Sequence, residues 1–225
     1  TQQSLVNNRE TLDVASSFFN EMEAIEHVRN LMKALPTTVT TADAMNIQAI
    51  RTAYDALSEN AKQFVTNYDG FVQKEATVNS LKKIEQVKAL IEALPSVDQV
   101  VEADQMRIRQ ARQAYDALTT DEKVKITNYN VLTDVEEAFD NLQAVEQKVK
   151  HVETLIGNLP TVSNVAISDK TNILAARAAY EALTNTQKLR VSNVESLKRI
   201  EAQLNKLLEA SGEQPIEIPE DLEEN

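Results

Sequence analysis

IRTAYDAL, at residues 50–57, returns as ARQAYDAL at residues 111–118 and as AARAAYEAL at residues 175–183. In each copy an Asn follows the Tyr after 13 positions, and a Leu-Pro pair precedes the copy. Self-similarity at a period of about 60 residues predicts a tandem array of small units. The markers of the three copies are Tyr54, Tyr115 and Tyr180, then Asn67, Asn128 and Asn193, and the prolines Pro36, Pro95 and Pro160.

The composition of the chain indicates helices. Of its 225 residues, 42% are hydrophobic and 26% charged, which is enough aliphatic material for packed cores. Three Gly and five Pro are too few for an all-β fold, which needs a turn every ~8 to 12 residues. The sequence therefore predicts an all-α fold.

The segment from each repeated Asn to the next Pro is predicted to be one long helix. In the third copy, apolar residues follow one another at steps of three and four, as in an amphipathic helix. This segment is four residues longer than in the first two copies, and four residues are close to one helical turn. The apolar face is therefore expected to persist through Leu132, Val135, Phe139, Leu142, Val145, Val149, Val152, Ile156 and Leu159.

A second, medium helix is predicted around each repeated Tyr. Asp43, Asp104 and Asp169 stand 11 positions before the Tyr, where N-caps or first-turn acids are expected. Apolar residues at helical spacing supply its buried face. They are Ile47, Ile50, Tyr54 and Leu57 in the first copy, Ile108, Ala111, Tyr115 and Leu118 in the second, and Ile173, Ala176, Tyr180 and Leu183 in the third.

A short third helix is predicted to follow. Its expected N-caps are Ser58, Thr119 and Thr184, and Glu122 and Gln187 complete a capping-box pattern in the last two copies. The repeated Asn then marks a break, either as an αL C-cap or as the N-cap of the next long helix. Asn8 lies in a matching stretch, so the chain is expected to open inside the last helices of an earlier unit.

Each unit is therefore expected to contain a long, a medium and a short helix, with the long helix shared between neighbours. Such an array of three-helix repeats would form an elongated rod or solenoid. The predicted parts are the end of a preceding repeat with its connector helix at 1–35, repeats at 36–94, 95–159 and 160–210, and an acidic, Pro-containing linker at 211–225.

The charge and the absence of reactive motifs narrow the function classes. A formal net charge of −12 argues against nucleic acid as a partner, and no apolar run is long enough for membrane insertion. There is no Cys, and His27 and His151 lie in different long helices without a metal-binding spacing. We therefore predict no catalytic, cofactor-binding or metal-binding residues, and no enzymatic activity.

The repeated polar and aromatic residues allow two interpretations. The Tyr row could display binding aromatics, but its helical spacing favours packing with the hydroxyl at the edge of the core. Arg51, Arg112 and Arg177 stand four positions before an acidic residue, which favours surface ion pairs over a ligand-binding row. The row of Lys62, Lys123 and Lys188 and the Asn row also have structural explanations.

The pattern LIxALP, followed by IxxARxAYDALTxxxKxxVTN and a long helix rich in Leu and Glu, resembles a known kind of repeat. It is similar to the helical tandem repeats of Gram-positive cell-surface proteins, including S-layer-associated and wall-anchored multi-domain proteins. The resemblance extends over nearly the whole chain up to about residue 210. It implies an extracellular, surface-attached parent protein in which this array is a spacer or assembly segment.

The leading hypothesis is a non-catalytic structural spacer that projects or positions flanking domains of a larger chain. The alternative is an adhesin or protein-binding module that uses an exposed helix face, and lateral self-association is also open. An intracellular spectrin-like scaffold ranks third and an enzyme last.

Overall fold

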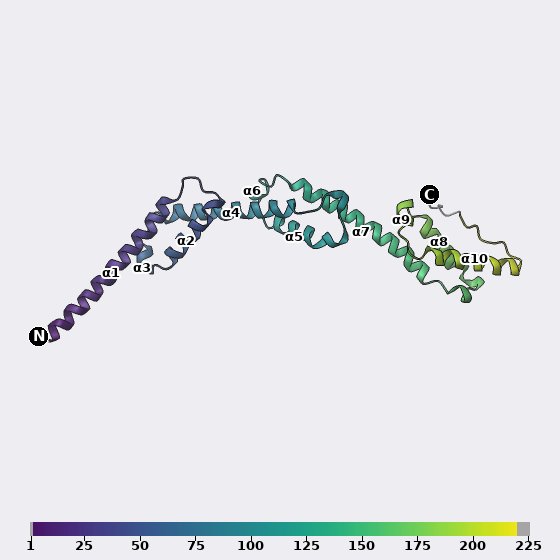
Figure 1. Cartoon of the computed structure of the whole chain (residues 1–225), viewed down its shortest axis with the longest axis horizontal. Coiled ribbons are helices and arrows are strands. Elements are labelled where there is room, and N and C mark those ends of the chain that lie inside the picture. Colours follow the sequence, from purple (N-terminus) through teal and green to yellow (C-terminus); the bar gives the residue numbers. More distant parts are fainter. Residues whose placement is uncertain (1, 220–225) are drawn as a thin grey trace. The chain divides into compact units, whose positions relative to one another are not determined.

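The computed structural model describes residues 2–219, and every regular element in that range is helical (Figure 1). Helices account for 76% of the structure, and the described residues include no strand. The prediction of an all-α chain is thus confirmed. The short supply of Gly and Pro agrees with this outcome, because such a chain can make few tight turns.

The helices fall into three length classes. The long helices are α1 (Gln2–Ala34), α4 (Tyr68–Glu92), α7 (Tyr129–Gly157) and α10 (Val194–Ser211). The medium helices are α2 (Ala44–Asp55), α5 (Gln105–Asp116) and α8 (Lys170–Glu181). The short helices are α3 (Glu59–Lys62), α6 (Thr120–Lys123) and α9 (Asn185–Lys188). Single 3-10 turns lie at Thr41–Asp43, Val97–Gln99, Glu102–Asp104, Val162–Asn164 and Ile167–Asp169.

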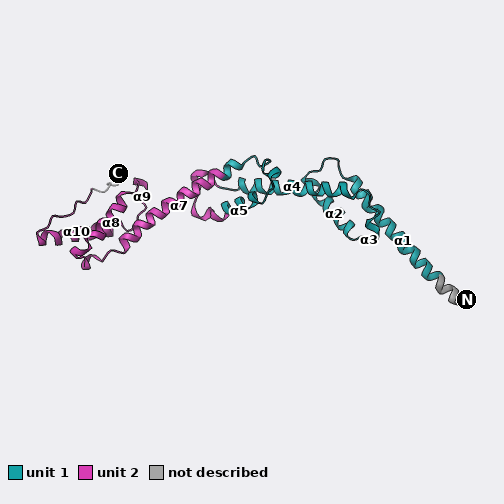
Figure 2. Cartoon of the chain, turned by 180° about the vertical axis from the view of Figure 1, so that it is seen from behind, with its two compact units in different colours: residues 1–94, 107–132 teal, residues 95–106, 133–225 magenta. Residues whose placement is uncertain are grey.

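The contacts of the chain divide it into two compact units (Figure 2). The first comprises residues 1–94 and 107–132, and the second comprises residues 95–106 and 133–225. Each unit has its own hydrophobic clusters, and each is described separately below.

The first unit contains two cores, and α4 supplies both. Phe71 and Val78, in the first half of α4, belong to a cluster with Ile50 of α2 and Val28 of α1. The second half of α4 supplies Ile84, Val87 and Ile91 to another cluster, together with Ala111, Leu118, Ile126 and Leu132. A single uninterrupted helix therefore connects two cores of this unit.

The core of the second unit forms between α8, α10 and the last part of α7. Ile173, Leu197 and Leu204 are completely buried in it, with Val152 of α7 beside them. The predicted insertion of four residues is absorbed within the helix, since α7 has 29 residues and α4 has 25. As expected, the apolar spacing holds across the extra turn.

The acidic segment after α10 folds back onto that helix. Gly212 ends α10 with a φ of +80°, a left-handed conformation that Gly adopts without strain. The side chain of Asn205, within α10, forms two hydrogen bonds with the backbone of Ile216. Its Nδ2 donates to the Ile216 carbonyl at 3.2 Å, and its Oδ1 accepts from the Ile216 N–H at 2.7 Å. The first residues of the predicted linker are thus tied to the second unit.

Helix caps follow the sequence patterns where the short helices begin. Thr119 Oγ1 accepts from the Glu122 N–H at 3.3 Å, and Glu122 Oε2 accepts from the Thr119 N–H at 2.9 Å. Thr184 and Gln187 repeat this capping box, and Ser58 accepts from the Ala61 N–H at 3.1 Å. The predicted N-caps of the short helices are confirmed.

The repeated Asp residues act differently from the prediction. Each lies directly before a medium helix, but the side chains of Asp43 and Asp169 make no cap bond to their helices. Instead the carboxylate accepts from the backbone N–H three residues earlier and so closes a 3-10 turn. The distances are 2.8 Å for Asp43 to Thr40, 3.0 Å for Asp104 to Val101 and 2.8 Å for Asp169 to Ala166.

The αL alternative for the repeated Asn residues is wrong, because no described non-Gly residue has a positive φ. Asn67 and Asn193 occupy N-cap positions, but neither side chain caps its helix. At Asn8 no break occurs, and α1 runs through it. The other three Asn side chains bond to residues 38 to 40 positions earlier in the chain, and Asn8 has no such residue in this sequence.

Candidate functional site

A polar cluster recurs beside each repeated Tyr, and in the first unit it is built around Arg51. Its Nε donates to Glu75 Oε1 at 2.8 Å, and its Nη2 pairs with the other oxygen of the same carboxylate. Its Nη1 also donates to the Tyr68 hydroxyl at 2.9 Å. The bond to Glu75, and then that to Tyr68, raise the pKa of Arg51 above its ordinary value. This guanidinium is therefore held by fixed internal partners.

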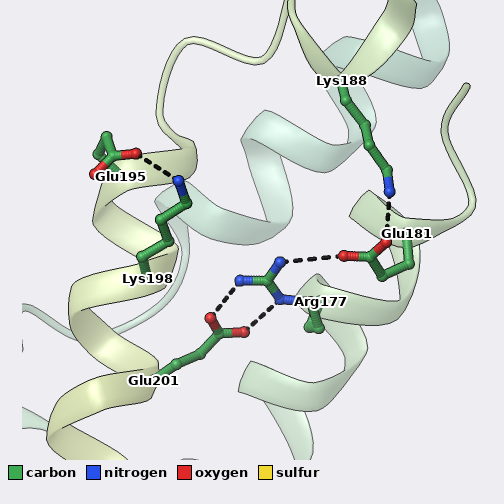
Figure 3. Close-up of polar contacts among 6 residues, drawn as sticks. All are labelled: Arg177, Glu181, Lys188, Glu195, Lys198 and Glu201. Carbon is green, nitrogen blue, oxygen red and sulfur yellow. Dashed lines mark hydrogen bonds and ion pairs between the residues drawn. The ribbon is translucent and has the colours of Figure 1, made fainter. Parts of the chain in front are cut away.

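The same arrangement is most deeply buried in the second unit, around Arg177 (Figure 3). Its Nε and Nη2 donate to Glu201 at 2.7 Å and 2.5 Å, with side-chain exposures of 6% for Arg177 and 0% for Glu201. The predicted pair with Glu181 is also present, at 3.2 Å, and Lys188 contacts the same carboxylate. Two acidic and two basic groups thus neutralise one another.

In the second copy, Arg112 pairs with Asp116 at 3.6 Å and donates to the Tyr129 hydroxyl at 3.5 Å. The predicted i, i+4 pairs are therefore present in all three copies, since Arg51 lies 3.7 Å from Asp55. Such pairs contribute only about 0.2 to 0.5 kcal/mol each on an exposed helix face. In the third copy the prediction of a surface pair is wrong, because the Arg177 side chain is only 6% exposed. The tighter bidentate pairs were not predicted.

The partners missed by sequence reasoning stand 24 positions after the Arg. Glu75 and Glu201 occupy that position, and Glu136 stands there relative to Arg112. The constant interval was a usable signal in the repeats. It was not recognised because 24 residues match no local helical contact, and the pair forms only when two helices pack together.

The repeated Tyr side chains pack inside these clusters. Tyr54 stacks on Tyr68 with ring centroids 4.1 Å apart, and Tyr115 stacks on Tyr129 at 4.4 Å. Tyr180 is buried, with 6% exposure. Burial, and then the neighbouring Tyr68, raise the pKa of Tyr54. These contacts favour the packing interpretation of the Tyr row over a row of displayed binding aromatics.

The Lys row contacts the Tyr row. An Arg and a Lys lie near each ring, at distances at which cations interact with aromatic faces. The Lys Nζ atoms of Lys62, Lys123 and Lys188 lie 5.7, 5.3 and 5.2 Å from the ring centroids of Tyr54, Tyr115 and Tyr180. The guanidinium carbons of Arg51, Arg112 and Arg177 lie 5.9, 5.5 and 5.4 Å from the same rings.

The repeated Asn residues fasten each short-helix segment to the preceding long helix. Nδ2 donates to a backbone carbonyl, at 3.4 Å from Asn67 to Arg29, 3.0 Å from Asn128 to Lys88 and 2.9 Å from Asn193 to Glu153. The Oδ1 atom of each is buried and accepts no hydrogen bond from the described residues. This contact was not predicted, and it explains why the Asn is repeated.

Replacing Asn193 by Asp is expected to lower the free energy of unfolding by about 1 to 3 kcal/mol, because a carboxylate oxygen would face the Glu153 carbonyl. Urea unfolding followed by circular dichroism measures this loss. The matched control is Asn141→Asp on the exposed surface of α7, which should change stability by less than about 0.5 kcal/mol. Equal effects of the two substitutions would contradict the assigned role.

The segment before Asn193 is also held by Glu153. This carboxylate accepts from the Ser192 hydroxyl at 2.6 Å and from the Ser192 N–H at 2.9 Å. The hydroxyl bond, and then the backbone bond, lower the pKa of Glu153 below its ordinary value of 4.5. A lowered folded-state pKa contributes stability above the unfolded value, and this stability is lost as pH falls through the folded value.

Ser192→Ala is therefore expected to raise the pKa of Glu153 toward its ordinary value and to shrink its contribution to stability at neutral pH. NMR titration of the Glu153 side-chain carboxyl carbon measures the pKa directly. The Ser196→Ala variant, one turn further along, serves as control and should leave this pKa unchanged. An unaltered Glu153 titration in the Ser192 variant would refute the assignment.

A shallow groove lies between a long helix and a short helix in each unit. In the first unit its lining includes Phe18, Met22 and Phe64. The corresponding positions in the second unit are Ala138, Leu142 and Arg190. The groove of the first unit is thus the more apolar of the two.

His27 and His151 lie on different long helices, as predicted, and both are exposed. Among the described residues, no group of three or more His, Cys, Asp or Glu side chains could hold a metal ion. No described helix combines the length and apolar character that crossing a membrane requires.

Comparison with protein-family models, curated proteins and solved structures finds no match to this chain.

Proposed function

We propose that this chain is a non-catalytic structural spacer or assembly segment that positions flanking domains of a larger protein. The observation that carries the proposal is the double role of α4, whose two halves belong to different hydrophobic cores. A continuous helix shared by two cores restrains their separation. A flexible linker would leave that separation free.

The proposed building element of this spacer is the predicted three-helix repeat. In the proposed arrangement, successive repeats share long helices and extend into a rod or solenoid. Recurring contacts support this proposal. The Arg–Glu pair, the capped short helix and the Asn–carbonyl bond appear at equivalent positions in different copies. Contacts that recur at the repeat period favour a series of similar modules.

The pairing of the polar residues supports a structural role over catalysis. In the recurring clusters, Arg, Glu, Tyr and Lys side chains engage one another, and in the second unit the central ion pair is almost fully buried. Catalytic groups need access to a substrate in a concave site. A bacterial cell-surface location is proposed from the resemblance of the repeat pattern alone.

A protein-binding module is the second candidate, and the apolar groove of the first unit favours it. Phe18 and Phe64 line this groove and are 65% and 62% exposed. Exposed apolar patches often mark protein interaction sites. A saturable protein partner whose binding is lost in Phe64→Ala would move the preference to this alternative.

Small-angle X-ray scattering, with the mass measured on the same sample, tests the spacer. A compact monomer of this length is expected to have a radius of gyration of about 17 Å. A rod on the order of 110 Å long would have a radius of gyration of about 32 Å. A monomeric value near the larger figure is the expected result. A value near the smaller figure would refute the spacer.

A further inference from the structure

An apolar row on α1 lies exposed where equivalent rows are buried. Leu12 and Phe19 stand seven positions apart on this helix and are 67% and 61% exposed. Phe18 and Met22 are also exposed, at 65% and 49%. Further along the helix, Ile25 and Val28 enter the first core. The exposed row therefore continues an apolar face that is already packed.

The repeat register identifies the counterparts of Leu12 and Phe19. Aligning Asn8 with the other repeated Asn residues places Leu12 with Phe71, Leu132 and Leu197, and Phe19 with Val78, Phe139 and Leu204. Each of these six residues is at most 9% exposed. Leu12 and Phe19 are thus the exceptions within a pattern that buries both positions.

In two hydrophobic clusters, the counterparts of both Leu12 and Phe19 are present and are covered by equivalent elements. Phe71 and Val78 share a cluster with Ile47 and Ile50 of α2, and with Val65 after α3. In the second unit, Leu197 and Leu204 share a cluster with Ile173, Ala176 and Tyr180 of α8, and with Val191 after α9. In both, a medium helix and the short-helix segment that follows it belong to the cover, together with part of the preceding long helix.

We propose that residues 8–23 of α1 form a docking surface for one kind of partner, a medium helix and its short helix from another repeat of this pattern. The medium helix would present Ile, Ala and Tyr at the spacing of α8. The inference rests on the repeat of the proposed function, but not on its role as a spacer. A compact scattering profile would refute the spacer and leave this surface unaffected.

One position of the surface departs from the pattern. Ser16 stands where the other copies have Glu75, Glu136 and Glu201, the position that pairs with the Arg of the medium helix in two copies. A partner bearing that Arg would therefore find no carboxylate at this position of α1. Ser16→Glu is expected to restore the pair and tighten docking.

An in-register extension of the full chain tests the proposal. Residues 95–120 are placed directly before Thr1, because Thr1 is equivalent to Asp121. The added segment supplies a second copy of α5 and of the Thr119 cap, and Gln2 falls three positions after that cap, as Glu122 does in its own copy. The helix of the extended chain is then expected to be interrupted at Asn8.

Hydrogen–deuterium exchange of the amides of residues 8–23 is the readout. The extended chain should exchange there roughly tenfold more slowly than the original chain, because docking stabilises the helix against local opening. Adding Ser16→Glu should slow exchange further. The control extension carries Asp at the copied positions of Ile108 and Ala111, which removes its apolar face, and it should give no protection.

Unchanged exchange of residues 8–23 in the extended chain would overturn the proposal. A second overturning result concerns the original chain by itself. If sedimentation shows a dimer that Leu12→Ala or Phe19→Ala dissociates, the face binds a second copy of α1 and not a medium helix. Protection that survives in the control extension would equally exclude the proposed partner.

Discussion

The Glu201→Gln variant is expected to lose about 3 to 5 kcal/mol of stability in the second unit. Glu201 is fully buried and accepts two hydrogen bonds from Arg177, whose side chain is only 6% exposed. Gln keeps the size of the side chain but removes its charge, so the guanidinium would remain buried after losing the charge of its bidentate partner. Removing one partner of a buried pair costs much more than the pair itself contributes.

Urea unfolding followed by circular dichroism, together with hydrogen exchange of α8 and α10, measures this loss. The matched control is Glu195→Gln on the same helix. Glu195 pairs with Lys198 at 2.8 Å, but the two side chains are 67% and 38% exposed (Figure 3). Its removal should cost at most about 1 kcal/mol. If both variants lose the same stability, the burial of the Arg177 pair has no energetic importance.

Leu197→Ala is expected to lower the free energy of unfolding by about 2 to 5 kcal/mol, because it opens a cavity in a packed core. Leu197 is completely buried in the cluster that contains Ile173 and Leu204. Thermal and urea unfolding of the purified variant give the measurement. The spread of the expected range reflects how far neighbouring side chains can relax into the space.

Leu12→Ala is the matched control, because Leu12 occupies the equivalent position of the repeat with 67% exposure. This change should alter stability by less than about 0.5 kcal/mol. In the chain extended by residues 95–120, the same substitution should become destabilising. A large effect of Leu12→Ala in the original chain would mean that another part of the molecule already covers this face.

Local features of the fold were predictable because they depend on residues close in sequence. The Ser and Thr caps, the helical spacing of Ile47, Ile50 and Leu57, and the end of each long helix near Leu-Pro follow from such signals. The four extra residues of α7 were also predictable, since an insertion near one turn preserves the helical face.

The contacts of the polar cluster depend on tertiary packing and were less predictable. Asp43 was expected at a helix start and lies there, but its carboxylate closes the preceding turn. The Arg51–Glu75 pair and the Asn128–Lys88 bond join residues 24 and 40 positions apart. Neither interval corresponds to a contact within one element, so only the packing of helices reveals these bonds.

The bond from each repeated Asn ends on the main chain of another helix. The three acceptor residues are Arg29, Lys88 and Glu153, which differ in charge and length but present the same carbonyl group. Any residue with a helical carbonyl at that place can therefore serve. Because the fastening is indifferent to the side chain beneath it, the residues at these acceptor positions can diverge while the hydrogen bond is retained.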